Sequence, residues 1–137
     1  MDDVDRVEQA MIAIRRRQSR RTLAGGKEAA GQAFDVLDVI ESSHQPTVST
    51  VAAALAVDQS RASKLIATAV GTNLVRRTAD QADGRRSVLM LTSRGQAVVA
   101  AAHQRRRETF DRAMSGWTES ERAEFARLLT RFIEAMP

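Results

Sequence analysis

The sequence contains no cysteine, so it excludes thiol redox sensing, cysteine-based zinc sites and a disulfide scaffold. Its first residues are acidic and no long apolar run follows them, so it predicts neither a signal peptide nor a transmembrane helix. These absences are compatible with a reducing cytosol. We therefore expect a soluble, cytoplasmic protein with no membrane partner.

Histidine is almost as scarce, which limits the chemistry that the chain can perform. His44 and His103 are 59 positions apart and have no metal-ligand spacing, so we interpret them as a loop histidine and a helix-face histidine. The carboxylates form no paired catalytic arrangement. An enzyme is the rival class of function, and the sequence supplies no catalytic, metal or cofactor site for it.

The 137 residues are 43% hydrophobic and 28% charged, which is enough for one packed domain without metals or disulfides. Twenty-one Lys and Arg residues against 17 Asp and Glu residues give a formal charge of +4. This excess favours an anionic partner, although a modest net charge bears on solubility before it bears on function.

Apolar residues at helical spacing predict a first helix of about four turns that buries one face. The face contains Val4, Val7, Met11 and Ile14. Residues 15–27 then hold six basic side chains and no acid, the densest positive block in the chain. Two interpretations of this block stay open: a solvated helix end whose cations suit the helix dipole, and direct contact with phosphate.

A second helix is predicted from about residue 28, with Phe34, Leu37 and Ile40 along one side. A short polar loop follows it, and Thr47 can cap a third, short helix. The third helix is rich in alanine and has one apolar side. We therefore expect two helices that pack against each other through these sides.

The next segment has the pattern of a helix-turn-helix. A short turn ends at Asp58, which caps a fourth helix whose residues Leu65, Ile66 and Ala69 face inward. Glycine inside a helix costs up to about 1 kcal/mol relative to alanine, so we expect Gly71 to mark an early helix end. The outward face of this helix is polar and consists of Gln59, Ser60, Arg61, Ser63, Lys64 and Thr68.

This polar face has two interpretations. Arginine and lysine can bond to guanine edges and glutamine to adenine, while serine and threonine fit closely against phosphates or bases in a major groove. Ordinary solvated helices carry the same residue types, and helix-turn-helix patterns are common false positives. The face alone therefore leaves a DNA reader and a solvated surface open.

The residues that follow favour the DNA reader. Asn73 suits a left-handed helix end, and residues 74–78 and 87–91 are strand-like runs on either side of a polar, positively charged tip. A helix-turn-helix followed by a β-hairpin is a winged helix. We therefore predict a mainly α fold of the α+β class, with a two-stranded β-wing.

Short motifs in this region occur in a distinctive order. Leu55-Ala56-Val57 precedes the polar helix, and Ser63-Lys64-Leu65-Ile66 lies inside it. Asp83-Gly84-Arg85 at the tip is followed by Leu91-Thr92-Ser93-Arg94-Gly95. In this order they resemble the MarR family of bacterial winged-helix transcription regulators, whose wing signature is Asp-x-Arg followed some six residues on by Leu-Thr-x-x-Gly. The resemblance covers nearly the whole chain.

The resemblance implies a role for the tip. It implies that Arg85 enters the minor groove and that Asp83 supports the wing. The chain departs from the family at Ser60, where relatives often have proline, and at Asn73, where glycine is usual. The predicted DNA-binding residues are Gln59, Ser60, Arg61, Ser63, Lys64, Thr68, Arg77, Arg85 and Arg86.

The C-terminal third is predicted to be helical from about Ser93, with a break at 115–117 and a capping box at 118–121. The last helix has an apolar stripe too wide for solvent. We expect the first and last helices to pack with those of a second copy, as in the family; the alternative is that they fold back on their own core. The stripe consists of Phe125, Leu128, Leu129, Phe132, Ile133 and Met136.

These expectations combine into a single domain over residues 1–137, with a winged-helix DNA-binding lobe at 28–92 and helical dimerisation regions at 1–22 and 93–137. The predicted function is a sequence-specific transcription regulator, a repressor, that binds a pseudo-palindromic operator in double-stranded DNA as a homodimer. The alternative is a winged-helix DNA organiser or protein-binding module without ligand control.

The resemblance also implies a small-molecule effector, whose binding residues the sequence does not identify. Relatives often have aromatic residues around the effector cleft, whereas this chain has no tyrosine, one tryptophan and four phenylalanines. Sensing of small aromatic acids is therefore unsupported by the sequence.

Overall fold

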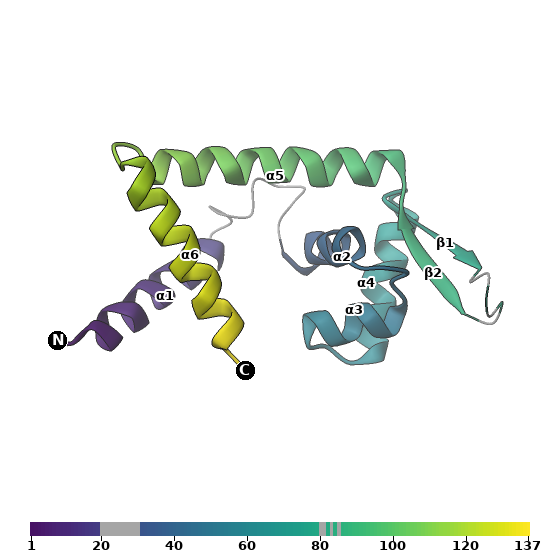
Figure 1. Ribbon diagram of the computed structural model, residues 1–137. Helices are drawn as coiled ribbons and strands as arrows, with labels where there is room; N and C mark the ends of the chain where they lie inside the picture. Colours follow the sequence, from purple (N-terminus) through teal and green to yellow (C-terminus); the bar gives the residue numbers. More distant parts are fainter. Residues whose placement is uncertain (20–30, 80–81, 83, 85) are drawn as a thin grey trace. The chain divides into compact units, whose positions relative to one another are not determined.

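The computed structural model describes residues 1–19, 31–79, 82, 84 and 86–137. Within these residues the chain forms six helices and one two-stranded antiparallel sheet (Figure 1). The predicted mainly α fold with a β-wing is therefore confirmed. The elements are α1 (Asp3–Ser19), α2 (Gly31–Ser42), α3 (Val48–Leu55), α4 (Gln59–Gly71), β1 (Val75–Ala79), β2 (Ser87–Leu91), α5 (Ser93–Ala113) and α6 (Glu119–Ala135).

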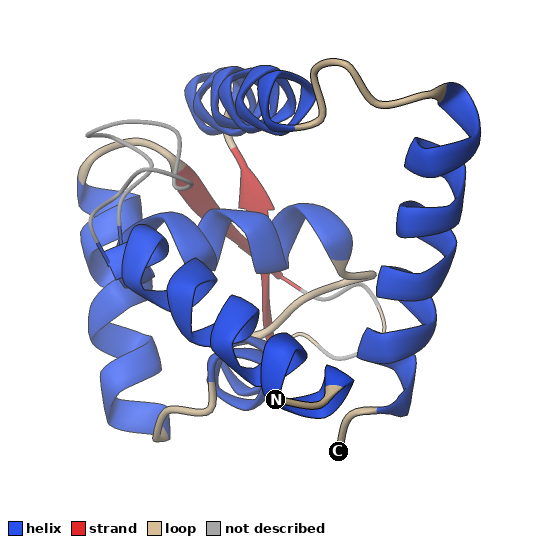
Figure 2. Cartoon of the chain, turned by 90° about the vertical axis from the view of Figure 1, so that its left-hand side faces the viewer, coloured by secondary structure: helices blue, strands red, loops and turns tan. Residues whose placement is uncertain are grey.

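The hydrophobic core of the winged lobe is built from α2, α3, α4, the two strands and the first half of α5. Figure 2 shows β1 and β2 as the two strands among the helices. The side of α2 predicted to be buried is buried, and so is the inward side of α4. The buried residues are Phe34, Val36, Leu37, Ile40, Val51, Ala52, Ala62, Leu65, Ile66, Ala69, Val75, Leu89, Val99 and Ala102.

Two of the predicted helix caps hold the helix-turn-helix in place. The Thr47 hydroxyl accepts a hydrogen bond from the Thr50 backbone N–H, and the Thr50 hydroxyl accepts one from the Thr47 N–H, which satisfies both ends of a capping box. The Asp58 carboxylate accepts from the Arg61 backbone N–H at 2.7 Å and caps α4. Between the helices, Ala56 takes the left-handed conformation, with φ 54°.

The end of α4 lies where Gly71 and Asn73 predict it. Gly71 is the last residue of the helix. Beyond it, Asn73 adopts the expected left-handed conformation, with φ 61°, and lets the Leu74 N–H reach the Ala69 carbonyl at 2.9 Å. This pattern closes a helix by satisfying its last carbonyl groups, and it offsets the cost of a glycine in the final turn.

The wing is a regular antiparallel hairpin in which Val75 pairs with Leu91 and Ala79 with Ser87. Its base is fixed to the rest of the lobe, because the Leu89 N–H donates to the Pro46 carbonyl at 2.8 Å. The predicted tip residues Asp83 and Arg85 lie outside the described residues.

The start of α5 is attached to the turn between α4 and β1. The Thr92 hydroxyl caps α5 by accepting from the Gly95 N–H at 3.0 Å, and it donates to the Asn73 carbonyl at 2.7 Å. The Thr92 N–H donates to the Leu74 carbonyl at 3.1 Å. The threonine and glycine of the Leu-Thr-x-x-Gly motif therefore join α5 to the base of the wing.

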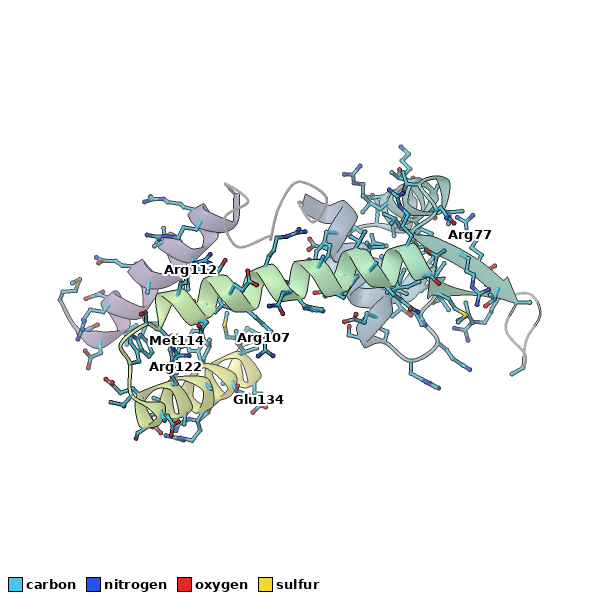
Figure 3. The ribbon with its side chains drawn as sticks, turned by 90° about the horizontal axis from the view of Figure 1, so that it is seen from above. Arg77, Arg107, Arg112, Met114, Arg122 and Glu134 are labelled. Carbon is cyan, nitrogen blue, oxygen red and sulfur yellow. The ribbon has the colours of Figure 1, made fainter. Side chains whose placement is uncertain are left out.

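The chain divides into two compact units, Met1–Arg106 and Arg107–Pro137. In the second unit, Arg122 of α6 pairs with Asp111 at 2.7 Å and donates to the Met114 carbonyl at 3.0 Å (Figure 3). These contacts close the helical hairpin at the predicted break. The predicted capping box at the start of α6 is also present, formed by the side chains of Thr118 and Glu121.

Candidate nucleic-acid interface

The helix-turn-helix gives α4 one buried and one exposed face. Ser60, Lys64, Ala67 and Gly71 follow one another at intervals of four, three and four residues, and all four are exposed. This spacing places them in one row along the helix, opposite the buried residues. Three of the four residues are small. The row therefore offers one cation and a surface on which another molecule can approach the helix backbone closely.

The other predicted residues of α4 flank this row. Ser63 and Arg61 are exposed on its two sides. The Thr68 hydroxyl donates to the Lys64 carbonyl at 3.1 Å, within its own helix. The Gln59 amide donates to the Ser49 hydroxyl of α3 at 3.3 Å, so in this structure its side chain also connects the two helices.

Sequence reasoning missed Ala67 and Gly71 because it looked for hydrogen-bonding side chains. The signal was present as spacing, since these residues continue the row begun by Ser60 and Lys64. Gly71 has open space around it, with no atom within 4 Å of the position of an added Cβ. A small residue at this end of the face leaves room for another molecule to approach the helix backbone closely.

The wing adds exposed cations to those of α4. Arg76 and Arg86 are exposed, on β1 and just before β2 respectively. Arg77 is exposed on β1 (Figure 3). Arg76 lies across the hairpin from Met90, with its guanidinium 3.7 Å from the Met90 sulfur. Arg77 pairs with Leu89 of β2; the Leu89 side chain is buried, whereas Arg77 is exposed.

The charged side chains of α4 are all positive. The segment that forms α4 contains two basic residues, Arg61 and Lys64, and no acidic residue. The only carboxylate at its start is that of Asp58, which is engaged in the helix cap. A polyanion can therefore approach the exposed face without meeting a negative side chain of the helix itself.

A cavity of about 780 Å³ lies on the winged lobe, and no residue of α4 lines it. It is lined by the end of α2, the loop after it, both strands and the start of α5. Its lining mixes apolar and polar residues, among them Ile40, Glu41, Leu89 and Gln96.

The two histidines lie where the sequence indicated. His44 is exposed in the loop after α2, and His103 lies on α5. His103 is half-buried and in contact with residues of α2, which the sequence did not reveal.

Residues 30–86, which contain α2, α3, α4 and β1, match the model of the MarR family. This part of the chain is similar to the MarR family. No curated protein sequence matches it. Residues 30–86 also contain every predicted DNA-binding residue.

Solved structures show that the fold of this protein is shared over nearly its full length. RV1404 from Mycobacterium tuberculosis is 24% identical, covers 98% of this chain and 95% of its own, and superposes with a TM-score of 0.79. FabT from Streptococcus pneumoniae, solved in complex with DNA, is 19% identical, with 96% of each chain covered and a TM-score of 0.77. The PcaV transcriptional regulator from Streptomyces coelicolor, solved with its natural ligand, is 24% identical, with 90% of each chain covered and a TM-score of 0.63.

No helix in the described ranges of this protein is long and apolar enough to cross a membrane.

Proposed function

We propose that this protein is a member of the MarR family and a sequence-specific DNA-binding transcription regulator, a repressor, that acts in the cytoplasm as a homodimer. The observation that carries the proposal is the exposed row of α4, which combines small residues with Lys64 and is followed by a wing rich in exposed arginine. A major groove admits an α-helix, and a row of small residues lets the helix backbone lie deep in it.

The division of labour between helix and wing follows from residue chemistry. Ser60, Ser63 and Lys64 point outward from the second helix of a helix-turn-helix, the element that reads base edges in this motif. Arg77 and Arg86 on the wing present cations to the phosphate backbone. We further propose that Gln59, Arg61 and Thr68 take part in binding the helix to DNA, that Arg85 enters the minor groove and that Asp83 supports the wing.

The homodimer accounts for apolar surface that a single chain leaves uncovered. Val4 of α1 is 76% exposed, and Ile133 of α6 is 59% exposed. No residue of α6 is buried, although its apolar stripe extends along its whole length. Surfaces of this kind are protein–protein contact sites, and a second copy presents a matching stripe by symmetry.

A two-fold dimer sets the form of the operator. Its two copies of α4 enter successive major grooves, so we expect a pseudo-palindrome with half-site centres about 10 base pairs apart. An effector would act only if its affinity differs between the DNA-competent and the DNA-incompetent arrangement of the dimer. The cavity of about 780 Å³ on the winged lobe is the candidate place for it.

Fluorescence anisotropy at fixed salt tests the interface. The variants Lys64→Ala and Arg85→Ala are expected to weaken operator binding at least tenfold while the protein stays folded. The matched control is Arg6→Ala, which removes the same charge from an exposed arginine of α1 that pairs with Asp3. Equal weakening by all three variants would mean that net charge alone binds DNA, and the assigned interface would be wrong.

A competition assay separates a regulator from a DNA organiser. A regulator prefers its own promoter region over random DNA by orders of magnitude, roughly 10³ or more. An organiser shows little preference, and a protein-binding module shows little DNA binding at all. A ratio close to one would support the organiser.

A further inference from the structure

Three ligand-type side chains from two helices meet outside the DNA-facing surface. Asp38 and Glu41 are one turn apart on α2, and His103 is on α5. The His103 Nε2 lies 2.9 Å from Glu41 Oε1 and 3.8 Å from Asp38 Oδ1. One atom from each of the three residues lies within 4.8 Å of the other two. We name these residues the carboxylate–histidine cluster.

We propose that the carboxylate–histidine cluster binds Zn²⁺ and joins α2 to α5 through the metal. In a tetrahedral site with Zn–N and Zn–O bonds of about 2.1 Å, neighbouring ligand atoms are about 3.4 Å apart. The two measured edges, 2.9 and 3.8 Å, lie on either side of this value. The third edge, between the two carboxylates, is within 4.8 Å, so rotation of the side chains is needed to bring the three atoms to a common centre.

The donor set favours zinc over the common hard cations. One imidazole nitrogen with two carboxylate oxygens is a combination that zinc accepts, whereas Mg²⁺ requires nearly all-oxygen octahedral coordination. Among divalent metals, Zn²⁺ also binds such ligands more tightly than Mn²⁺ does. The three residues leave a fourth position for water. Each of the three side chains is between 42% and 45% exposed, so a metal ion can reach them from solvent.

The site adjoins the cavity on the winged lobe. Glu41 also lines the cavity of about 780 Å³ on the winged lobe. A metal held by Glu41 would therefore stand at the edge of a space large enough for water or a small ligand. Negative charge gathers on this side of α2, where partial burial and then the charge of Asp38 raise the pKa of Asp35.

Zinc binding would break a hydrogen bond between Arg106 and His103. The Arg106 guanidinium donates to His103 Nδ1 at 2.9 Å, which makes Nε2 the protonated nitrogen and the donor to Glu41. Zinc at Nε2 moves the ring proton to Nδ1, so Arg106 must release that nitrogen. It can do so because its guanidinium also lies 5.1 Å from the centre of the Phe34 ring and 3.8 Å from Asp38. The buried Nε of Arg106 has no hydrogen-bond partner among the described residues, so the hydrogen-bonding capacity of this guanidinium is not fully used.

Isothermal titration of the tag-free, full-length protein with Zn²⁺ alone tests the site. We expect one zinc ion per chain in the wild type and an affinity at least tenfold lower in His103→Gln. Glu41→Gln should lower the affinity in the same way, and it provides the test should His103→Gln fail to fold. Arg106→Gln should raise the affinity several-fold, because it removes a competing cation and supplies an acceptor for Nδ1–H.

His44→Gln is the matched control, because it removes the chain's other histidine from an exposed loop. Its affinity should equal that of the wild type. The proposal is overturned if the wild type binds no zinc, or if His103→Gln and Glu41→Gln bind it as tightly as the wild type. Because the titration contains no DNA, its outcome is independent of the proposed DNA-binding function.

Discussion

Replacing Gly95 by alanine tests the contact that fixes α5 to the base of the wing. A Cβ at this position would lie 2.1 Å from the Leu74 carbonyl oxygen and 3.1 Å from its carbon. Cβ atoms essentially never approach other atoms closer than 3.0 Å, so the backbone must move by about 1 Å on one side. The atom that is struck belongs to the backbone and accepts a hydrogen bond from Thr92, so it cannot simply turn away.

The cost follows from these contacts. Loss of the hydrogen bond between Thr92 and Leu74 costs about 1 kcal/mol, and forcing packed backbone apart costs a further 1–3 kcal/mol or so. Alanine returns up to about 1 kcal/mol through its better helix propensity. We therefore expect the free energy of unfolding to fall by roughly 1–3 kcal/mol, a large part of the 5–15 kcal/mol that is typical of a folded protein.

Urea unfolding followed by circular dichroism measures this change, at one fixed protein concentration because we propose that the folded state is a dimer. Gly71→Ala is the matched control, because the same substitution meets open space in α4. It should leave stability unchanged or raise it by up to about 1 kcal/mol. The reasoning is refuted if Gly95→Ala proves as stable as the wild type or more stable.

Three further changes have expected outcomes. Ala56→Gly should raise the free energy of unfolding by about 0.5–1 kcal/mol in the same assay, because alanine is strained at φ 54°; a loss of stability would contradict this strain. Thr92→Val should lower it by about 1–2 kcal/mol, because it removes both the cap of α5 and the bond to the Asn73 carbonyl, and no change would exclude that role. The hydrogen bond from Arg122 lowers the pKa of Asp111, so this group stabilises the fold above about pH 3.8 and ceases to do so as the pH falls further. Melting curves between pH 2.5 and 7 should therefore show a weaker acid dependence for Asp111→Asn than for the wild type, whereas identical curves would exclude the pair as a contributor.

Local signals in the sequence were enough to predict much of the fold. The caps at Thr47, Asp58 and Thr118 depend on residues three positions away, so the chain reveals them directly. The buried side of each helix of the lobe follows from spacing in the same way. The end of α4 at Gly71 could be predicted for the same reason, because the conformational preferences of Gly71 and Asn73 act on the local backbone.

Contacts between distant parts of the chain could not be predicted. Gly95 belongs to a known motif, but its requirement for hydrogen as a side chain comes from Leu74, twenty-one positions earlier. The carboxylate–histidine cluster joins positions 41 and 103, so no short spacing marks it. In the interface, residue chemistry predicted Ser60 and Lys64, while the small residues between and beyond them became meaningful only when α4 showed which face is exposed.

The central claim is that a symmetric dimer of this protein reads DNA through α4. Selection of bound sequences from a pool of random double-stranded DNA tests it most directly. The account predicts enrichment of an inverted repeat whose half-site centres are about 10 base pairs apart. Enrichment of no sequence, or of a motif without two-fold symmetry, would contradict it.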